Sequence, residues 1–366
     1  MTLQEYLISS AEKNSDIFMK LGYAPAGQNG PYGCEDTPVR NTAHWLITYK
    51  YLWENTQNTK YLDLIQQFAN FLLKDEYRGE LGAIKCISGP QMDSLNGLVG
   101  QAWAIEGLVA AAECLQDNRY IRRASEIFHS QKFEQKTGLW KRVDLDGTLL
   151  GYDPVYNHQL WFAAAGAKLA NREADDIVKR QIQAFLLRSS QNFMVHPTGL
   201  AYHYAKDAWE TNLFRTKNLI KKYISDWYGK TSPWSTFDQK NYEKAYHMFV
   251  FFGFAILYCF EPTHPFFQSR KFKKGLQYCM QSSNFDILRV KRTYSYYYNS
   301  PAFEFPLIQE VFHQNKDSEM EHYWKMQLEC AYNRQTGSLD SGAVDSATLE
   351  ARIYEYAQYL ELKRKK

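Results

Sequence analysis

The 366-residue sequence lacks the cysteine patterns of disulfide frameworks and zinc sites. Its six cysteines form no Cys-x-x-Cys pair, and none stands at a metal-like spacing from a histidine. We therefore expect reduced, mostly buried thiols, as in proteins of a reducing compartment. The histidines show no regular spacing of their own, so no metal site is expected.

The sequence also lacks a long apolar run and an excess of charge. No stretch approaches the roughly 20 apolar residues of a membrane-spanning helix, and the nearest, "MFVFFGFAILYCF" at 248–260, is interpreted as a buried core helix. The 43 basic and 40 acidic residues nearly cancel, and the one dense basic run, "LELKRKK" at the C-terminus, is interpreted as a solvated helix end. Neither a nucleic-acid partner nor a membrane span is therefore expected. The opening "MTLQEYLISSAEKNSDIF" carries charges every few residues, unlike a secretory signal, so a cytoplasmic location is expected.

Aromatic residues, in contrast, make up 16% of the chain, and three of the tryptophans recur at a fixed interval. Trp45, Trp103 and Trp161 are each 58 residues apart, and each lies near the start of a helical pattern. After the first two, a short polar turn leads to a second helical pattern that opens on Tyr61 or Tyr120. A helix–turn–helix unit that recurs at this length predicts an array of hairpins.

The two helices of each predicted hairpin differ in polarity. The first is apolar nearly all round, as in "GQAWAIEGLVAAAECL", and this predicts burial. The second has a polar side, as in "NRYIRRASEIF", and is predicted to face solvent. Inner helices ringed by outer helices define an all-α fold, an (α/α)6 toroid, and a chain of this length holds about six such hairpins. No Gly/Ser-rich linker divides the sequence, so residues 1–366 are predicted to form one domain.

The second half of the chain loses the tryptophan period but keeps helical patterns. These predict helices near 207–225, 241–260, 268–280, 305–315, 318–333 and 346–363. Between two of the earlier helices, the pair Asp146-Gly147 in "DLDGT" favours a tight β-hairpin.

Polar residues gather just before each periodic tryptophan. In chain order they are Glu35, Asp36, Arg40, Asn41 and His44, then Asp93, Asn96 and Gln101, then Asp153, Tyr156, Asn157 and His158. Because the N-termini of the inner helices share one end of a toroid, we expect these side chains to converge in one funnel. Helix N-termini there carry free N–H groups and partial positive charge, which suit an anionic oligo- or polysaccharide. The aromatic residues predicted to stack on sugar rings beside them are Trp140, Trp209 and Tyr298.

A plainer interpretation stays open for each of these residues, namely that they cap helices and pack at the edge of the core. Asn is among the preferred N-cap residues, so Asn157 could simply start its helix. The three periodic tryptophans are interpreted mainly as core residues.

The stretch "GQAWAIEGLVAAAECLQDNRYIRRASEIF" at 100–128, with "KTGLWKRVDLDG" after it, resembles the six-hairpin glycosidase superfamily. Within it the resemblance is greatest to the unsaturated glucuronyl and rhamnogalacturonyl hydrolases. It implies a cytoplasmic α/α toroid that removes an unsaturated uronic acid from oligosaccharides, with aspartate as the acid/base. Asp93 in "QMDSLNGL" resembles one acidic position of that family, and Asp36 is the candidate for the second.

The stretch "NHQLWFAAAG", which begins at Asn157, is similar to the Asn-His-x-x-Trp helix start of alginate-lyase-type polysaccharide lyases. These lyases are also α/α toroids, and the resemblance implies a catalytic Tyr-His pair about one hairpin later. Tyr202 and His203 in "GLAYHYAKDAW" stand at that place.

These residue types suit the removal of a proton next to a uronate carboxylate. An amide such as Asn157 can hydrogen-bond the developing enolate-like oxygen. Histidine titrates near neutral pH, so His158 is the predicted base for the C5 proton. Tyr202 then protonates the leaving oxygen or acts as a base itself, and the outcome is β-elimination or C5 epimerisation. Neither course requires a metal or an organic cofactor.

Two alternatives stay open. One is hydrolysis initiated by hydration of an unsaturated uronide through Asp93, with a partner such as Asp36. The other is a toroid that binds an anionic glycan without turning it over.

Overall fold

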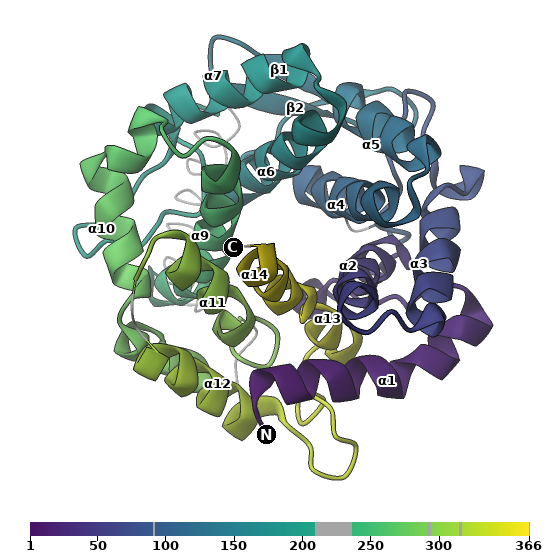
Figure 1. The fold of residues 1–366 in the computed structure, drawn as a ribbon. Helices are drawn as coiled ribbons and strands as arrows, with labels where there is room; N and C mark the ends of the chain where they lie inside the picture. The colour runs from purple at the N-terminus through teal and green to yellow at the C-terminus, as the bar shows by residue number, and fades with distance from the viewer. Residues whose placement is uncertain (91, 209–235, 291–293, 315–316, 366) are drawn as a thin grey trace, which may run out of the picture.

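A ring of inner helices surrounds the centre of the molecule (Figure 1). The computed structural model describes residues 1–90, 92–208, 236–290, 294–314 and 317–365. Within these residues the inner helices are α2 (Val39–Thr56), α4 (Gly97–Leu115), α6 (Tyr156–Glu173), α9 (Thr236–Phe260), α11 (Pro301–Val311) and α14 (Tyr354–Lys365). Each contacts the next one along the chain, and α14 contacts α2, so the first and last inner helices close the ring.

An outer layer of helices covers this ring. It consists of α1 (Leu3–Leu21), α3 (Thr59–Leu72), α5 (Asn118–Ser130), α7 (Asp176–Asn192), α10 (Arg270–Cys279) and α12 (Asp317–Ala331). Each of α3, α5, α7, α10 and α12 contacts the inner helix that precedes it in the chain, as the predicted hairpins require. The fold is therefore the predicted (α/α)6 toroid, and the three periodic tryptophans mark its first three inner helices.

Inner and outer helices begin differently. The outer helices α3, α5 and α7 each start at a residue whose side chain accepts a hydrogen bond from an N–H group of the first turn, namely Asn58, Asp117 and Asp175. The inner helices α2, α4 and α6 start at Pro38, Asn96 and Val155, and none of these three forms such a side-chain bond. The first N–H groups of the inner helices are thus left for other partners at one end of the ring.

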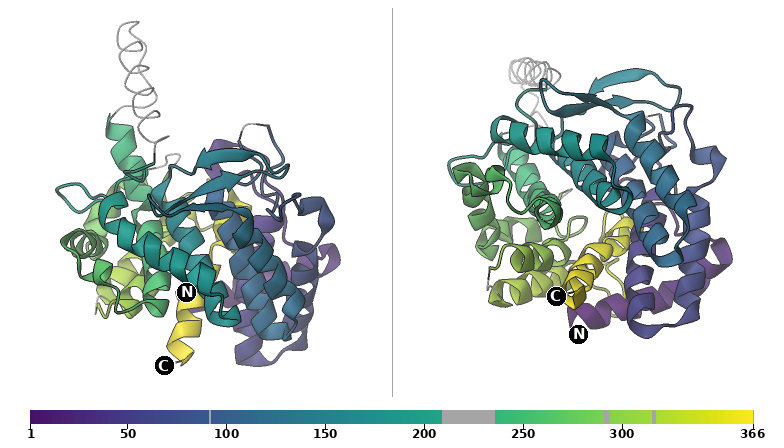
Figure 2. Two further views of the ribbon diagram at one scale, coloured as in Figure 1. Left: turned by 90° about the horizontal axis from the view of Figure 1, so that it is seen from above. Right: turned by 45° about the horizontal axis from the view of Figure 1, so that its top comes forward.

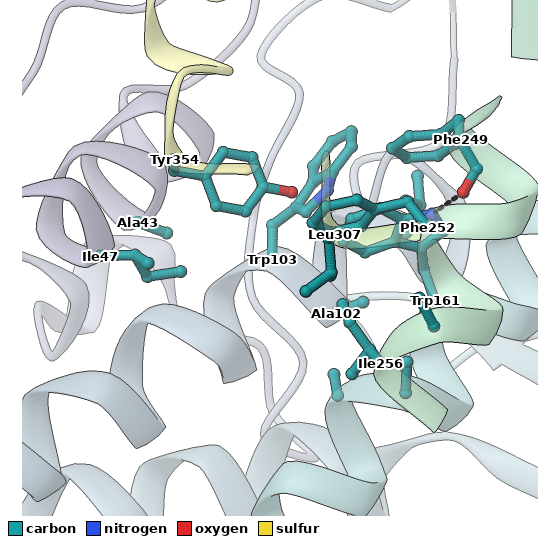
Figure 3. Close-up of a cluster of buried hydrophobic side chains, with 14 of the residues drawn as sticks. Ala43, Ile47, Ala102, Trp103, Trp161, Phe249, Phe252, Ile256, Leu307 and Tyr354 are labelled. Carbon is teal, nitrogen blue, oxygen red and sulfur yellow. Dashed lines mark hydrogen bonds between the residues drawn. The ribbon is translucent and has the colours of Figure 1, made fainter. Parts of the chain in front are cut away.

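Small and aromatic residues pack the inner helices together. A Cβ atom at Gly107 of α4 would lie 3.0 Å from the Cα atom of Ala43 in α2, so these two helices approach too closely for a larger residue. Trp161 is fully buried, and its indole N–H donates to the carbonyl of Phe249 in α9 at 3.1 Å (Figure 3). Trp45 is also buried, as predicted. Trp103 is buried too, but it reaches a cavity at one end of the ring.

A three-stranded antiparallel sheet stands over one end of the ring, and the C-terminus of α14 lies at the other end (Figure 2). Its strands are β1 (Lys132–Glu134), β2 (Leu139–Val143) and β3 (Leu149–Tyr152). Gly147 has a φ of +80° in the β2–β3 turn, and its N–H donates to the Asp144 carbonyl at 3.0 Å, so the predicted hairpin is confirmed. The remaining short helices are η1 (Gly30–Tyr32), η2 (Asp75–Tyr77), η3 (Pro265–Gln268), η4 (Ser282–Arg289) and α13 (Ser346–Ala351).

Several predicted helices need correction. The pattern at 346–363 forms two helices, α13 and α14, because the chain leaves the helix between them at Arg352, whose side chain bonds to α11. The predicted helix at 305–315 begins earlier, at Pro301, since proline is favoured in the first turn of a helix. Most of the pattern at 207–225 lies outside the described residues.

The helix that most resembles a membrane span in length and mean hydropathy is also a different one from that expected. The stretch at 248–260 is part of α9 and is largely buried, as predicted. Among the described helices, however, α4 is the one with the length and mean hydropathy of a membrane span, and 83% of it is buried inside the molecule. Its apolar composition is therefore accounted for by its place in the inner ring.

Candidate functional site

A cavity of about 240 Å³ lies at the end of the ring where the inner helices begin. Its polar walls are formed by Asn29, Arg40, Asn96, Asn157, His158, His203, Asn299 and Arg352. Its aromatic walls are formed by Tyr32, Trp103, Tyr204, Tyr242, Tyr246, Phe249 and Tyr298. The structure thus brings together Arg40, Asn96, Asn157 and His158, which stand before three different tryptophans in the sequence.

His158 is held in one orientation by Asp153. Its Nδ1 atom lies 2.9 Å from Oδ2 of Asp153, a buried carboxylate just before α6. Burial alone would raise the pKa of Asp153, but the charge and hydrogen bond of His158, together with Arg142 and the Leu98 N–H, lower it to about 2. An ionised carboxylate only accepts hydrogen bonds, so Nδ1 of His158 carries a proton, and in the neutral ring Nε2 is the atom that has the lone pair. Among the described residues, none bonds to that Nε2 atom.

The start of α4 makes room for this pair. Gly97 has a φ of +61°, and a Cβ atom there would lie 2.5 Å from Oδ2 of Asp153 and 2.6 Å from Nδ1 of His158. The N–H of Leu98 donates to the same carboxylate oxygen at 2.9 Å. The first turn of one inner helix therefore positions the histidine–carboxylate pair of the next.

Asn157 is not the cap of its helix. The N-cap of α6 is Val155, so Asn157 lies inside the first turn, and its interpretation as a cap is wrong. Its side chain is buried at the cavity wall, and its Oδ1 atom has no hydrogen-bond partner within the described part of the chain. An unpaired buried polar group costs about 1–3 kcal/mol. A ligand group in the cavity would remove that cost.

A second histidine, His203, lines the same cavity. Its Nε2 atom lies 2.9 Å from the hydroxyl of Tyr242, and that hydroxyl lies 3.0 Å from the hydroxyl of Tyr32. Burial, together with the charge of the neighbouring His158, lowers the pKa of His203 to about 3. His203 is therefore a neutral imidazole near pH 7, and its Nδ1 atom has no partner among the residues described.

Arg40 supplies a weakly paired positive charge. Its Nη1 atom is 4.0 Å from the carboxylate of Asp36, and its hydrogen bonds to the Tyr298 hydroxyl and the Asn29 amide oxygen are both 3.4 Å long. Its Nε atom has no partner in the described ranges. Burial raises the pKa of Asp36 to about 6, although Arg40 acts in the opposite direction. Asp36 thus neutralises Arg40 only in part, and the guanidinium group is available to an anionic ligand.

Arg352, the other arginine of the cavity, is fully engaged with the protein. It forms ion pairs with Glu304 and, at 2.9 Å, with Glu355, and it donates to Oδ1 of Asn299 at 2.8 Å. Burial raises the pKa of Glu355 to about 7 within this cluster, although Arg352 acts in the opposite direction. Arg352 therefore holds α11 and α14 together, and Arg40 is left as the cation for a ligand.

The described lining residues include no Asp or Glu. The two carboxylates predicted for hydrolysis lie outside the wall. Asp93 forms an ion pair with Arg142 and accepts the N–H of Gly97 at 2.9 Å. Asp36 is buried beside Arg40. No group of three or more His, Cys, Asp or Glu side chains in the described residues is placed to hold a metal ion.

His44 and Gln101 serve packing instead of lining the cavity. The His44 ring is fully buried and stacks on Tyr354 at 4.0 Å between centroids, and burial lowers its pKa well below the usual value. Gln101 clamps the backbone of Ile84 with two hydrogen bonds of 2.8 Å. Gln159, 58 residues further on, forms the same double bond with the backbone of Trp140. The placement of Gln101 in the substrate site therefore mistook a repeated structural clamp for a ligand contact.

The structure does not bring three further predicted residues to the cavity. Trp140 is fully buried in an aromatic cluster beneath the sheet. Tyr156 is buried and donates to the Ser189 hydroxyl at 2.9 Å. Tyr202 stacks on His196 at 3.8 Å between centroids and is not among the lining residues. Trp209 lies outside the described residues.

Sequence reasoning missed the tyrosines of α9 and two charged residues. Tyr242 and Tyr246 stand four residues apart in "NYEKAYHMFV", and that spacing on an apolar helix was the signal for an aromatic wall. Asp153, five residues before His158, was recognisable as polar but not as its partner. Arg352 gave no signal, because its role depends on Glu304 from another helix.

The fold and the cavity define a class of protein, the (α/α)6 toroids with a polar and aromatic pocket where the inner helices begin. Among solved structures the chain is similar to unsaturated glucuronyl hydrolase from Bacillus sp. GL1, at 12% identity and a TM-score of 0.61 over 100% of this chain and 97% of that one. It is also similar to cellobiose 2-epimerase from Spirochaeta thermophila, at 13% identity and a TM-score of 0.60 over 89% and 86% of the two chains. A polysaccharide lyase matches at 10% identity and a TM-score of 0.59 over 99% of both chains. These similarities confirm the predicted (α/α)6 toroid fold.

The particular family follows from the sequence comparison. No family model matches the chain. The chain is 31% identical over 361 residues to archaeal glycosylation protein Q of Haloferax volcanii, and the match covers 97% of this chain and 96% of that protein. The chain belongs to the family of archaeal glycosylation protein Q.

Proposed function

We propose that this protein is an enzyme that binds a uronic-acid-containing saccharide and removes the proton at C5, next to the carboxylate. The observation that carries the proposal is the His158–Asp153 pair. It presents an unpartnered Nε2 atom to a cavity whose described lining residues include arginine but no carboxylate.

Arg40 and Asn157 are the groups that would receive the uronate. A guanidinium group matches a carboxylate in charge and in planar geometry. Pairing with Arg40 withdraws charge from the carboxylate and makes the C5 proton more acidic. The Nδ2 group of Asn157, which lines the cavity, would then donate a hydrogen bond to the oxygen on which charge develops. The surrounding tyrosines and Trp103 offer flat surfaces for the sugar ring.

His158 would act as the base through Nε2. The ionised Asp153 behind it stabilises the imidazolium that forms when the C5 proton is taken up. General base catalysis of this kind contributes about 100-fold to 10,000-fold in rate. Asp153 also fixes the ring orientation, because Nδ1 of His158 is committed to it.

Of the two outcomes, C5 epimerisation is favoured over β-elimination. Epimerisation requires a second group that returns a proton to the carbon, and His203 lines the same cavity as His158. The 31% identical relative is a glycosylation protein, which fits a reaction that alters a glycan during its synthesis rather than one that cleaves it.

The test is nuclear magnetic resonance of uronic-acid-terminated oligosaccharides incubated with the enzyme in D2O. We expect loss of the C5 proton signal and appearance of the C5 epimer carrying deuterium. An unsaturated uronide with a vinyl proton would instead show β-elimination, with the same first step. A panel of uronides with no C5 exchange at all would contradict the proposal.

Hydrolysis of an unsaturated uronide through Asp93 is the second candidate. It is supported by the shared fold with unsaturated glucuronyl hydrolase and by Met92, next to Asp93, which lines the cavity. In this case an unsaturated oligosaccharide incubated with the enzyme would lose its vinyl proton signal. The Asp93→Asn variant would leave that signal unchanged. Binding of a uronide with no spectral change would support the remaining alternative, a glycan-binding toroid.

A further inference from the structure

Three side chains that are hydrogen-bonded in series connect the cavity wall with an exposed residue at the edge of the cavity. Nε2 of His203 is 2.9 Å from the Tyr242 hydroxyl, and the Tyr242 hydroxyl is 3.0 Å from the Tyr32 hydroxyl. Tyr32 is 40% exposed, whereas His203 is 6% exposed. The chain of three therefore runs from solvent to a buried ring at the cavity wall.

The inner end of this hydrogen-bonded series has a nitrogen atom available to a ligand. Nδ1 of His203 has no partner among the described residues, although the ring is buried. The titratable groups that act on His203 are His158, which lowers its pKa as burial does, and Asp153, which acts in the opposite direction, and the resulting pKa is about 3. An imidazole with this pKa cannot act by storing a proton as a cation near neutral pH. It can pass a proton only if one nitrogen gains a proton while the other loses one.

We propose that Tyr32, Tyr242 and His203 form a proton wire that delivers a solvent proton to the reacting carbon, with Tyr242 positioning His203 and relaying the proton. This inference rests on the proposed function and names the groups that complete it. It assigns the second proton transfer to His203 and not to Tyr202, which stacks on His196 away from the cavity.

The step balances without any further reactant. The Nδ1–H bond of His203 breaks and a C–H bond forms at C5 of the enolate, while Nδ1 keeps the electron pair of the broken bond. The Tyr242 hydroxyl gives its proton to Nε2, the Tyr32 hydroxyl gives its proton to the Tyr242 oxygen, and solvent gives one to Tyr32. His203 changes tautomer and stays neutral throughout. After the product leaves, water in the cavity gives a proton to Nδ1, Nε2 gives its proton to the Tyr242 oxygen, Tyr242 gives one to Tyr32, and Tyr32 gives one to solvent, so that the starting tautomer is restored.

The experiment compares two rates in D2O, the exchange of C5 hydrogen in recovered substrate and the formation of the epimer. The first reports the proposed base His158 alone, and the second also requires the wire. For Tyr242→Phe we expect epimer formation to fall about 10-fold to 100-fold, with exchange into recovered substrate and KM nearly unchanged. Tyr32→Phe, at an exposed position, should show the same pattern more weakly.

Tyr156→Phe is the matched control. Tyr156 is a buried tyrosine whose hydroxyl donates to Ser189 at 2.9 Å and which does not line the cavity, so both rates should match the wild type. Unchanged epimer formation in Tyr242→Phe and Tyr32→Phe would overturn the wire. An equal loss of both rates in Tyr242→Phe would also overturn it, because the residue would then only shape the cavity. If the wild-type protein exchanged no C5 hydrogen on any uronide, the proposed function itself would be wrong.

Imidazole nitrogen resonances of His203 give a test that needs no substrate. We expect one neutral tautomer pattern in the wild type, altered in Tyr242→Phe and unaltered in Tyr156→Phe. An identical pattern in all three proteins would show that Tyr242 does not control the His203 tautomer, and the wire would be wrong even if the enzyme epimerises uronides.

Discussion

The same inner helices form both ends of the ring, but the two ends differ in how their polar groups are paired. At the sheet end, the amide oxygen of Asn157 and Nδ1 of His203 have no partner among the described residues. At the opposite end, Lys50 is buried and contacts Glu54 at 3.1 Å, Glu113 at 3.2 Å and Glu361 at 2.5 Å.

The opposite end also contains a cavity, of about 160 Å³, and ion pairs dominate its lining, although Oε2 of Glu106 and Nε2 of Gln358 have no partner among the described residues. Lys168 donates to Glu106 of α4 and to Gln358 of α14, and so links three inner helices. Burial alone would raise the pKa of Glu361, but Lys50 and Lys365 lower it to about 2. These ion pairs join α2, α4, α6 and α14 where the ring has no sheet above it.

The difference teaches where stability and function lie in this fold. At one end the buried ion pairs of Lys50 hold the helices together, whereas at the other the Oδ1 atom of Asn157 and Nδ1 of His203, both from cavity-lining residues, are left for a ligand. A hollow in the ring is therefore not evidence of a site by itself. Whether the polar groups that line the hollow have hydrogen-bond or ion-pair partners is the more informative property.

The largest expected effect is on activity, from His158→Ala. Loss of the proposed base should lower the rate of C5 exchange about 100-fold to 10,000-fold. The free energy of unfolding should fall by no more than about 1–2 kcal/mol, because Asp153 keeps the N–H groups of Leu98 and Val155. Exchange kinetics and urea unfolding measure the two quantities. If this variant kept full activity and Asp93→Asn were inactive, catalysis would be assigned to Asp93 and Asp36 instead.

At the opposite end the expected effect is on stability. Lys50→Met leaves buried carboxylates without their cation, and removal of one partner from a buried ion pair costs about 3–5 kcal/mol. C5 exchange in the folded variant should match the wild type. The control is Lys365→Ala, whose side chain is 58% exposed and whose ion pair is worth about 0–1 kcal/mol. A loss of activity in Lys50→Met without loss of stability would contradict the division between the two ends.

The pH dependence of unfolding sharpens the same comparison. The pKa of Glu361 is about 2 in the folded protein against an ordinary value of 4.5. Its contribution to stability is therefore complete above about pH 4.5 and is lost as the pH falls through 2. A group with a shift of this size contributes about 3 kcal/mol or slightly more. Urea unfolding between these pH values should show a shallower loss for Glu361→Gln than for the wild type, and equal slopes would contradict the assignment.

The smallest expected effect is on substrate binding, from Arg40→Lys. The variant keeps the charge and loses the planar pair of donors, so KM for a uronide should rise about 10-fold, close to the lower end of the 1.5–3 kcal/mol typical of a hydrogen bond to a charged group. Stability should change little, since Arg40 is weakly paired. Arg352→Lys is the comparison variant. Because Arg352 has three partners, the main effect of this substitution should be a lower free energy of unfolding. An unchanged KM in Arg40→Lys would exclude this residue as the carboxylate site.

Much of the fold was predictable because it depends on local pattern. The period of Trp45, Trp103 and Trp161 and the contrast between apolar and amphipathic helices require hairpins stacked in a ring. The shared direction of the inner helices then predicts that Arg40, Asn96, Asn157 and His158 lie at one end. Only the geometry of a repeat is needed for that inference.

The rest of the site was not predictable, because residues of the same type serve different purposes. Gln101 and Asn157 are both buried amides at the start of inner helices. Gln101 finds the backbone of Ile84 to bond, and the Oδ1 atom of Asn157 finds no described group. Tyr242 and Tyr156 are both buried tyrosines, but only Tyr242 reaches a histidine in the cavity.

The sequence by itself determined the repeating hairpin, the buried inner helices and the end of the ring at which polar residues gather, since each depends on neighbours within one hairpin. The tertiary structure alone decided which polar groups are satisfied. Lys50 meets Glu361 and Arg352 meets Glu304, while Asn157 is left open. Such pairing is set by distances between helices far apart in the chain, and no local pattern of residues encodes those distances.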